Sequence, residues 1–410
     1  MEQLIAVALA VILIPLLLKF KIPVGAALII LGMFAGIVGG LSSMDISSAL
    51  WDVFLVPSNL SSVLIVIEIG MLSVLMAHYG ILDQMETALR EFLPFPKLLM
   101  MLFPAVVGAL QAPGGAALSA PLVNRLGTEM GLTRGQRANT NVICRHVLML
   151  LAPFSANMIV VQSVAPEVPI MKLALLNLGF VLLSQIAAYY FLLRNGRTVS
   201  EPGVSGKKRL HAFWKFNVTF SPIYLIILLN GLFHVPYTAA ILCAIGLLFF
   251  LGGREDFPRQ VFRSFSWNLA ILIVGVYFFQ NIVGRMGDLL ALFEHLVSAQ
   301  SELAFLVTAA VVGTIFGLAT GLMYLPLGVL VPIVANAAYP SEWEMMVRLF
   351  YVFLWCFIGY YFSPIHLCQL LTDKEVGCTP GERYRTYLPF LFLFPLFTVG
   401  LYLLYSLFLP

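Results

Sequence analysis

The sequence predicts an all-α polytopic membrane protein with two repeats of inverted topology, about ten transmembrane helices and two re-entrant hairpins. The first observation is composition: 60% of the 410 residues are hydrophobic, 10% are charged, and the mean hydropathy is +0.96. A soluble chain of this length could not cover its surface with so few charges. The second observation is that two hydrophobic blocks share one internal order. The third is that each block contains apolar stretches interrupted by Pro, Gly or small polar residues, which is typical of secondary transporters.

The apolar runs set the positions of the crossings, because a helix needs about 20 apolar residues to span a bilayer. Complete crossings are predicted near 3–18, 23–40, 60–79, 138–163 and 170–192 in the first block, and near 216–232, 236–252, 267–284, 343–371 and 386–408 in the second. The segments 97–125 and 302–335 are too long for one crossing and too short for two. Each therefore predicts a hairpin that enters and leaves on one side, which is tolerated only inside protein or along a watery cavity.

Short segments around these hairpins also recur in the two blocks. Similar lead-ins precede the hairpins, GILDQMETAL from Gly80 and GRMGDLLALF from Gly284. Residues 41–58 and 254–266 take equivalent places and are predicted to be short interfacial connectors. The chain is therefore divided into a first repeat at 1–193, a linker at 194–215 and a second repeat at 216–410.

The basic residues predict the orientation, because Lys and Arg are concentrated in cytoplasmic loops. With the N-terminus outside, Lys172, Arg285 and Arg348 fall on the outer side and Arg145 lies within a span, which leaves 19 of the 23 basic residues in the cytoplasm. Both termini are then outside and the 194–215 linker is inside. The two hairpins consequently enter from opposite sides. The N-terminus lacks a basic segment before its first apolar run, so no cleaved signal peptide is expected.

The hairpin tips are the first candidate binding residues. Pro113, Gly114 and Gly115 lie in QAPGGAALSAPLV, and a helix that starts near Ala116 would point its N-terminal amides at this tip. Such a helix end favours an anion, and Ser119 adds a hydroxyl one turn later. The matching residues of the second tip are Thr320 and Gly321, with Tyr324 roughly in the place of Ser119. The alternative is a tight turn without a ligand.

Two crossings are themselves interrupted. The interrupting residues are Pro153, Ser155 and Asn157 in the first block and Ser363, Pro364 and His366 in the second. Unwound backbone at these places exposes carbonyls for a cation and amides for an anion. A proline kink satisfied by neighbouring helices is the alternative, but a hairpin in each block favours a functional site.

Three residues are candidates for charge binding or ion coupling. Glu68 lies in the middle of the apolar run VLIVIEIGML, where a carboxylate is costly unless it is protonated, paired or hydrated. It is predicted either to bind a coupling proton or to pair with Arg145. Arg145 either faces the cavity and binds a substrate carboxylate, or extends to the cytoplasmic interface. His146 is either a proton carrier or a structural histidine. The five cysteines form no C-x-x-C pair and are interpreted as packing residues, with no metal site.

At these motifs the sequence resembles the ion-transporter superfamily of citrate, gluconate, C4-dicarboxylate and sodium–dicarboxylate transporters. PGGAALSAPLV and SPIHLCQLLT resemble an uncharacterised prokaryotic family within it. The resemblance covers nearly the whole chain and implies a homodimeric elevator-type transporter of the inner membrane. The site that it implies comprises Pro113, Gly114, Gly115, Ser119, Ser155, Asn157, Thr320, Gly321, Ser363, Pro364 and His366. The tips read Pro-Gly-Gly and Ala-Thr-Gly in place of the Ser-Asn-Thr signature of the sodium–dicarboxylate branch, which favours H⁺ over Na⁺ as the coupling ion.

The function expected from the sequence is cation-coupled secondary transport of a small organic anion, most simply a carboxylate. A Na⁺/H⁺ antiporter or other ion transporter is the nearest alternative, although Glu68 is the one acidic residue offered at mid-membrane. An intramembrane enzyme is disfavoured because the chain contains no H-E-x-x-H and no G-x-S-x-G motif. The expected partners are the substrate, the lipid bilayer and a second copy of the chain, with no nucleic acid and no cofactor beyond H⁺ or Na⁺.

Overall fold

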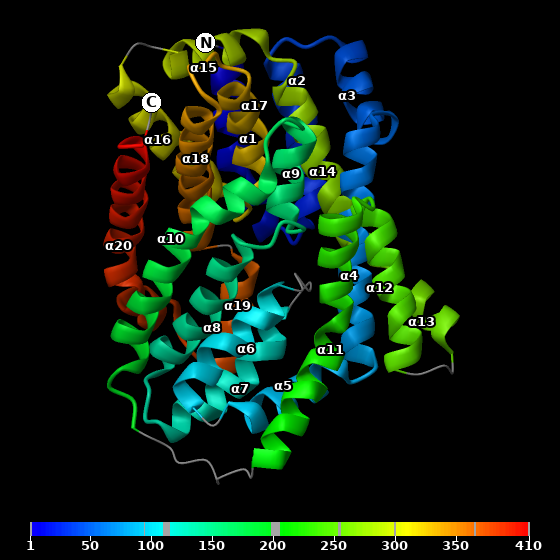
Figure 1. Cartoon of the computed structure of the whole chain (residues 1–410). Helices are drawn as coiled ribbons and strands as arrows, with labels where there is room; N and C mark the ends of the chain where they lie inside the picture. The colour runs from blue at the N-terminus through cyan, green and yellow to red at the C-terminus, as the bar shows by residue number, and fades with distance from the viewer. Residues whose placement is uncertain are drawn as a thin grey trace.

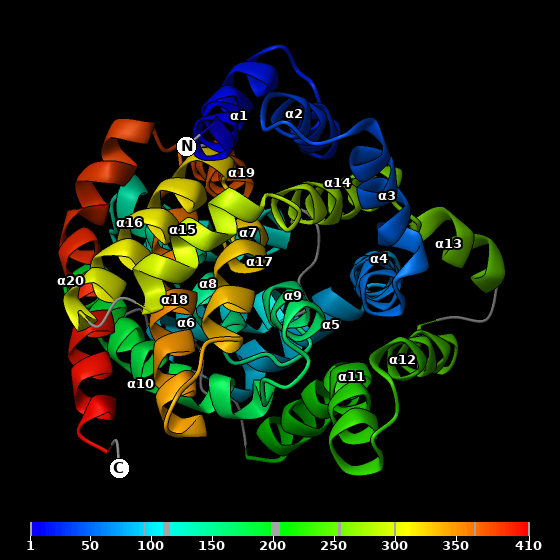
Figure 2. The same ribbon diagram turned by 90° about the horizontal axis from the view of Figure 1, so that it is seen from above.

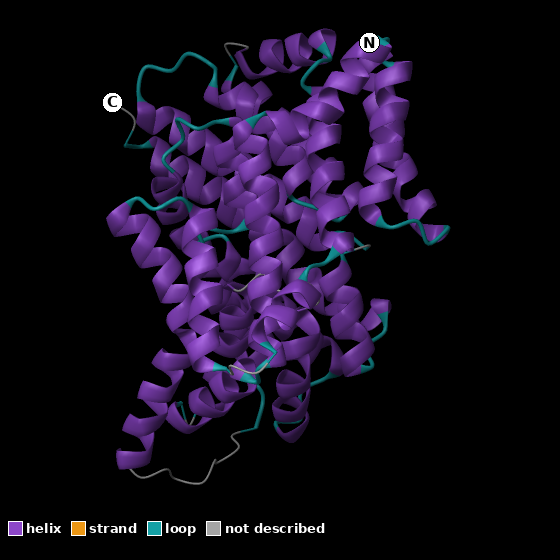
Figure 3. Cartoon of the chain, turned by 90° about the vertical axis from the view of Figure 1, so that its right-hand side faces the viewer, coloured by secondary structure: helices purple, strands orange, loops and turns teal. Residues whose placement is uncertain are grey.

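The computed structural model describes residues 2–93, 95–109, 115–197, 206–252, 256–298, 301–364 and 366–408. These residues form twenty α-helices and one short π-helix, with no strand among them (Figure 1, Figure 3). Within the described chain, six helices are long and apolar enough to cross a membrane, or seven if one bent pair counts as a single span. The protein is therefore an all-helical, polytopic membrane protein, and the full number of crossings stays a prediction.

The first ten helices extend from the N-terminus to the linker. They are α1 (Glu2–Lys19), α2 (Val24–Val38), α3 (Ser43–Leu55), α4 (Pro57–His78), α5 (Ile81–Phe92), α6 (Pro96–Ala109), α7 (Gly115–Glu129), α8 (Arg134–Met149), α9 (Ala156–Val164) and α10 (Ile170–Ala188). A π-helical turn, Tyr189–Leu193, extends α10.

The second ten helices begin at Gly206, so the last part of the predicted 194–215 linker is helical and belongs to the first of them. They are α11 (Gly206–Phe233), α12 (Tyr237–Leu251), α13 (Phe257–Ser264), α14 (Trp267–Val283), α15 (Gly287–Ser298), α16 (Glu302–Thr320), α17 (Tyr324–Ala335), α18 (Glu342–Phe362), α19 (Leu367–Val376) and α20 (Pro380–Ser406). Helices α8 and α20 begin with capping boxes at Thr133 and Thr379, whose hydroxyls accept from the amides of Gln136 and Glu382.

Three of the four predicted interruptions are confirmed as breaks between helices, and the tip of the first hairpin lies outside the described residues except for Gly115. The first hairpin separates into α6 and α7, and the second into α16 and α17. The two interrupted crossings separate into α8 and α9, and into α18 and α19. The two lead-ins form α5 and α15, and the predicted connectors contain α3 and α13. Pro and Gly stop these apolar helices because they remove a backbone donor or permit a left-handed turn.

The helices pack in pairs that join distant parts of the chain. Helix α2 packs on α14 and α12 on α4, while α7 packs on α19 and α9 on α17. Seen from above, α1 to α4 and α11 to α14 follow one side of the molecule, and α6 to α10 with α15 to α20 fill the other (Figure 2). In Figure 1 both termini lie toward the top, whereas the end of α10 and the start of α11 lie at the bottom. The three breaks that the structure describes are lined by buried residues, among them Ser155, Thr320 and Ser363.

Glycines allow the closest of these crossings. An ideal Cβ on Gly317 in α16 would lie 2.4 Å from the backbone nitrogen of Tyr360 in α18, and one on Gly359 would lie 2.4 Å from the backbone oxygen of Thr314. Small residues at such crossings let two membrane helices approach closely enough for backbone contact. The second hairpin is thus fixed against α18 just before that helix ends.

Replacing Gly317 with valine is expected to destabilise the protein by about 1–3 kcal/mol, because the new side chain overlaps the α18 backbone, which cannot rotate away. The measurement is thermal unfolding of the detergent-purified variant. Gly246→Val is the matched control, since a Cβ at Gly246 in α12 meets no atom within 4 Å. Equal stability of the two variants would contradict the close α16–α18 contact.

Candidate functional site

The candidate site lies where the helix breaks of the two halves meet. Helix α7 contacts α8 and α19, and α17 contacts α9 and α18. Pro113 and Gly114 lie outside the described residues, and Gly115 is the first residue of α7, as expected. Gly321 follows α16 with φ of +63°, a left-handed conformation that glycine adopts without strain. The helix that follows each break therefore begins inside the protein.

A buried polar network holds the start of the first hairpin's second helix. The Ser119 hydroxyl donates to Asn141 Oδ1 over 2.6 Å. The Asn141 amide nitrogen donates to the Ala116 carbonyl at 3.1 Å and to the Thr372 hydroxyl at 2.9 Å. Asn141 thus joins α7, α8 and α19, and all three polar side chains are fully buried. The sequence analysis identified Ser119 but missed Asn141 and Thr372. Three consecutive polar residues at 139–141, within a predicted crossing, could have indicated a buried polar network there.

Thr320 stabilises the turn at the second tip through hydrogen bonds to the neighbouring backbone. The Thr320 hydroxyl donates to the Phe316 carbonyl at 2.7 Å and accepts from the Leu322 amide at 3.1 Å. These bonds fix the turn that Gly321 makes between α16 and α17. Thr320 therefore positions the tip in this conformation. Tyr324 is the first residue of α17, whereas Ser119 is the fifth of α7, so their predicted equivalence stays a prediction.

The break between α8 and α9 leaves an amide side chain directed into the protein. Ser155 caps α9 by accepting a hydrogen bond from the Met158 amide at 3.3 Å, and Pro153 lies half-buried in the turn before it. Asn157 is 4% exposed, and its Oδ1 atom has no hydrogen-bond partner among the described residues. A buried acceptor without a partner is costly, so this atom is a good candidate to bind a ligand. The carbonyl of Leu150, freed at the end of α8, accepts from Asn177.

The break between α18 and α19 is held from three directions. The Ser363 hydroxyl donates to the Leu318 carbonyl of α16 at 2.7 Å, and Tyr384 donates to the Phe362 carbonyl at 3.2 Å. The Gln369 amide donates to the Tyr361 carbonyl. Pro364 is exposed, whereas His366 is buried and stands immediately before α19. The Tyr361 and Phe362 carbonyls, which the end of α18 leaves without helical partners, therefore accept side-chain hydrogen bonds. The His366 side chain points toward His146 of α8.

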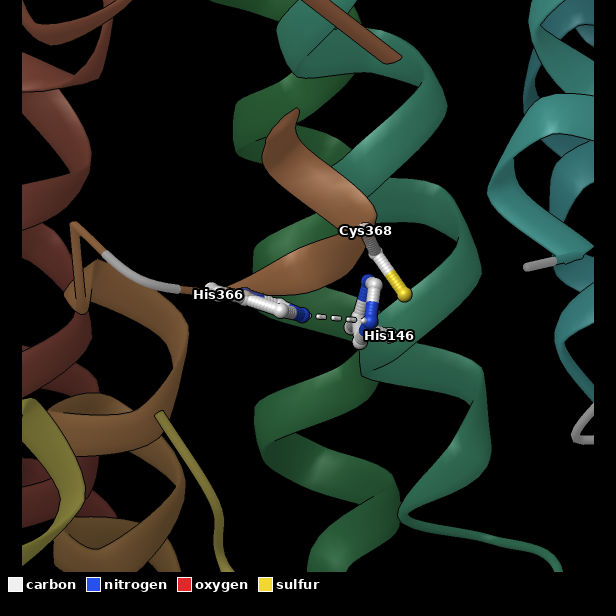
Figure 4. A group of neighbouring side chains, drawn as sticks. All are labelled: His146, His366 and Cys368. Carbon is white, nitrogen blue, oxygen red and sulfur yellow. Dashed lines mark hydrogen bonds between the residues drawn. The ribbon is translucent and has the colours of Figure 1, made fainter. Parts of the chain in front are cut away.

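Histidine and cysteine side chains meet between α8 and α19 (Figure 4). The Nε2 atoms of His146 and His366 are 3.1 Å apart, and the Cys368 sulfur lies beside them. The His146 Nδ1 atom is 2.7 Å from the Val142 carbonyl, so that nitrogen carries a proton and donates to the carbonyl. The sequence had suggested His146 and His366 separately, and the structure brings them together from positions 220 residues apart.

Arg145 lies in this interior region. It is 2% exposed, and its guanidinium is within hydrogen-bonding reach of the Cys368 thiol. An ideal Cβ on Gly108 of the first hairpin would lie 2.4 Å from the Arg145 carbonyl oxygen, so α6 presses directly on this part of α8. The buried Arg145 side chain fits the predicted interior position rather than extension to the cytoplasmic interface, and its binding of a substrate carboxylate stays a prediction.

Glu68 stands apart from this cluster, in α4, which packs on α12 and α14. Its Oε2 atom is buried and has no hydrogen-bond partner among the described residues. The described chain contains no ion pair between Glu68 and Arg145, so the predicted pairing is wrong for this conformation. The reason is placement, since α8 packs with α6, α7, α10, α19 and α20 rather than with α4. Glu68 remains an unpaired carboxylate within a membrane helix.

These contacts define a site whose donors favour an anion. The Arg145 guanidinium lies beside Cys368 in the first turn of α19, and both α7 and α19 pack on α8, so a cation and two helix N-terminal segments are close to one another. No curated protein is similar enough to the chain to match it. One family model, described as "Protein of unknown function (DUF401)", matches residues 3–404. Because this match spans nearly the full length, the chain belongs to the DUF401 family.

Proposed function

We propose that this protein is a cation-coupled secondary active transporter of a small organic anion, most simply a carboxylate, that works by elevator-type alternating access. The observation that carries the proposal is the buried Arg145, which lies beside Cys368 at the start of α19 and against Gly108 near the end of α6. A buried guanidinium can bind a carboxylate bidentately, with greater strength than a neutral hydrogen bond. Discontinuous helices at mid-membrane are the usual means by which transporters bind substrate and coupling ion.

The order and packing of the helices support two inverted repeats. Helices α1 to α10 and α11 to α20 can be matched one to one, with a hairpin at the sixth and seventh places and a broken crossing at the eighth and ninth. The contacts are reciprocal: α7 packs on α19 as α17 packs on α9, and α2 packs on α14 as α12 packs on α4. Reciprocal contacts of this kind are expected when two equivalent halves are related by a pseudo-two-fold axis in the membrane plane.

The same packing suggests which parts would move. The hairpins and broken helices contact one another on one side of the molecule, and α1 to α4 with α11 to α14 form the other side (Figure 2). We assign the first group to a transport domain and the second to a scaffold. One contact between them is the Gln280 side chain of α14, which fills the space at Gly328 of α17. Neither polar atom of the Gln280 amide has a partner among the described residues, as suits a contact that must break during transport.

The proposed orientation places both termini outside the cytoplasm and the 194–215 linker inside. The distribution of basic residues supports it, and so do the opposite positions of the termini and of the helix ends that flank the linker (Figure 1). A single cysteine introduced at Val204, in a variant lacking the five native cysteines, is expected to react with a membrane-impermeant maleimide only in inverted vesicles. Reaction in intact cells would contradict this topology.

Glu68 is proposed as the residue that couples transport to protons, because an unpaired carboxylate in a membrane span marks a proton or ion pathway. Glu68→Gln is expected to bind substrate with unchanged affinity but to lose accumulation driven by a pH gradient, since the amide cannot exchange a proton. The measurement is uptake into proteoliposomes with and without an imposed gradient. Full accumulation by the variant, or accumulation driven by a Na⁺ gradient at constant pH, would show that the proton assignment is wrong.

A ligand screen tests the proposed substrate class. Purified protein is heated with a panel of mono-, di- and tricarboxylates, and with neutral and cationic molecules of similar size, with and without Na⁺. Binding to the folded state raises the unfolding temperature by mass action. We expect stabilisation by one or more carboxylates without a requirement for Na⁺. Stabilisation by cations or neutral molecules alone would refute an anionic substrate.

A further inference from the structure

The imidazoles of His146 and His366 and the thiol of Cys368 form a group with the chemistry of a metal site. One potential ligand atom from each residue lies within 4.8 Å of the other two (Figure 4). The two histidine nitrogens are 3.1 Å apart, close to the roughly 3.3 Å that separates two nitrogens bound to one tetrahedral Zn²⁺ at about 2.0–2.1 Å. A small movement of the sulfur would bring the third ligand to bonding distance.

The hydrogen bonds around the histidines prepare their nitrogens for a metal. The His146 Nδ1–H group donates to the Val142 carbonyl, which leaves the lone pair of Nε2 directed at His366. Metal-binding histidines commonly donate their second nitrogen to a backbone carbonyl in this way. His366 is 2% exposed, and its Nδ1 atom has no partner among the described residues. A simple histidine–histidine hydrogen bond uses one imidazole lone pair, whereas a metal ion would use the Nε2 lone pairs of both rings.

The ligand types indicate which ion would bind. Two imidazoles and one thiolate suit Zn²⁺ and other borderline or soft transition metals, and they do not suit Na⁺, Mg²⁺ or Ca²⁺. Cys368 would lose its proton to solvent on binding, because the thiolate is the metal ligand. It is the partly exposed member of the three, so the ion can approach from its side. Arg145 lies beside the sulfur, so its positive charge would favour an anion as the fourth ligand of a tetrahedral ion.

We infer that His146, His366 and Cys368 bind one transition-metal ion of the Zn²⁺ class, with an exogenous anion as its fourth ligand. The ion would connect α8 of the first half to α19 of the second, immediately after the α18–α19 break. The inference goes beyond anion transport and does not depend on it, because metal binding is measured on purified protein without a membrane gradient.

The test is a titration of the metal-free, detergent-purified protein with Zn²⁺ in competition with a chromophoric chelator, followed by metal analysis of the desalted protein. We expect one Zn²⁺ per chain, and a loss of affinity of at least about tenfold in Cys368→Ser and in His366→Gln. Cys243→Ser is the matched control, because Cys243 is exposed on α12, outside the group, and should bind like the unmodified protein. No saturable binding, or equal binding by Cys368→Ser and the unmodified protein, would overturn the site.

A second measurement needs no variant, so it tests the site even if the substituted proteins do not fold. X-ray absorption spectra of the unmodified protein loaded with one equivalent of Zn²⁺ report the atoms around the ion directly. One sulfur at about 2.3 Å and two imidazole nitrogens at about 2.0–2.1 Å are expected. A shell without sulfur would exclude Cys368 as a ligand and overturn the inference.

Discussion

Replacing Arg145 with glutamine is expected to weaken binding of the substrate anion by about tenfold to a hundredfold, because a hydrogen bond to a charged group contributes about 1.5–3 kcal/mol. The side chain is 2% exposed and lies beside Cys368, at the start of the broken helix α19. Glutamine retains one donor pair but neither the charge nor the fork of the guanidinium. The measurement is the affinity for a carboxylate identified by the ligand screen, determined on folded, monodisperse protein.

Two further variants separate the roles of charge and geometry. Arg145→Lys keeps the positive charge without the planar fork, so its affinity should fall between those of the unmodified protein and Arg145→Gln. Arg137→Gln is the matched control on the same helix, because Arg137 hydrogen-bonds to Asn124 of α7 near the N-terminal end of α8. Unchanged affinity in Arg145→Gln, or an equal loss in Arg137→Gln, would exclude Arg145 as the anion-binding residue.

Replacing Arg383 with glutamine is expected to cost about 3–5 kcal/mol of folding free energy, the usual effect of removing one partner of a buried ion pair. Arg383 at the start of α20 pairs with Asp373 of α19, and both side chains are buried. The Oδ1 atom of Asp373 already has no partner among the described residues, so the variant would leave the carboxylate with little compensation. The measurement is equilibrium unfolding in detergent.

A double-mutant cycle tests whether the loss comes from the pair itself. Asp373→Asn with Arg383→Gln removes both charges together, so the double variant should be less destabilised than the sum of the two single variants. If the loss of stability in the double variant equals the sum of the losses in the two single variants, the two residues stabilise the protein independently. Glu382→Gln is a nearby control. The Thr379 amide and hydroxyl donate hydrogen bonds to the exposed Glu382 carboxylate and lower its pKa, and this carboxylate is not part of the buried pair.

Most of the secondary structure could be predicted from the sequence, because hydropathy and helix-breaking residues act locally. Long apolar runs became helices such as α4 and α10, and the segments containing Gly321 and Pro153 became breaks. The charge distribution predicted one side for the 194–215 linker and the other for both termini, and the helix ends lie accordingly (Figure 1). In a membrane, an unsatisfied backbone group is so costly that these local signals are strong.

The side-chain partners within the site could not be predicted, because they depend on packing between distant segments. Asn141 bonds to Thr372, 231 residues away, and His146 meets His366 over a similar separation. No local pattern indicates which of several polar residues in a span will face each other. The predicted pairing of Glu68 with Arg145 is wrong for this reason. Opposite charges at mid-membrane suggested a contact, but α4 packs mainly on α12 and α14, whereas α8 packs mainly on α6 and α7.

The measurement that tests transport most directly is uptake of a radiolabelled carboxylate by proteoliposomes, with the carboxylate chosen by the ligand screen. The account predicts saturable accumulation above protein-free liposomes, driven by an inward proton gradient, with the label recovered chemically unchanged. It also predicts that Arg145→Gln reduces this uptake at substrate concentrations that saturate the unmodified protein. A carboxylate that binds the purified protein but is not accumulated, or that emerges chemically altered, would contradict secondary transport.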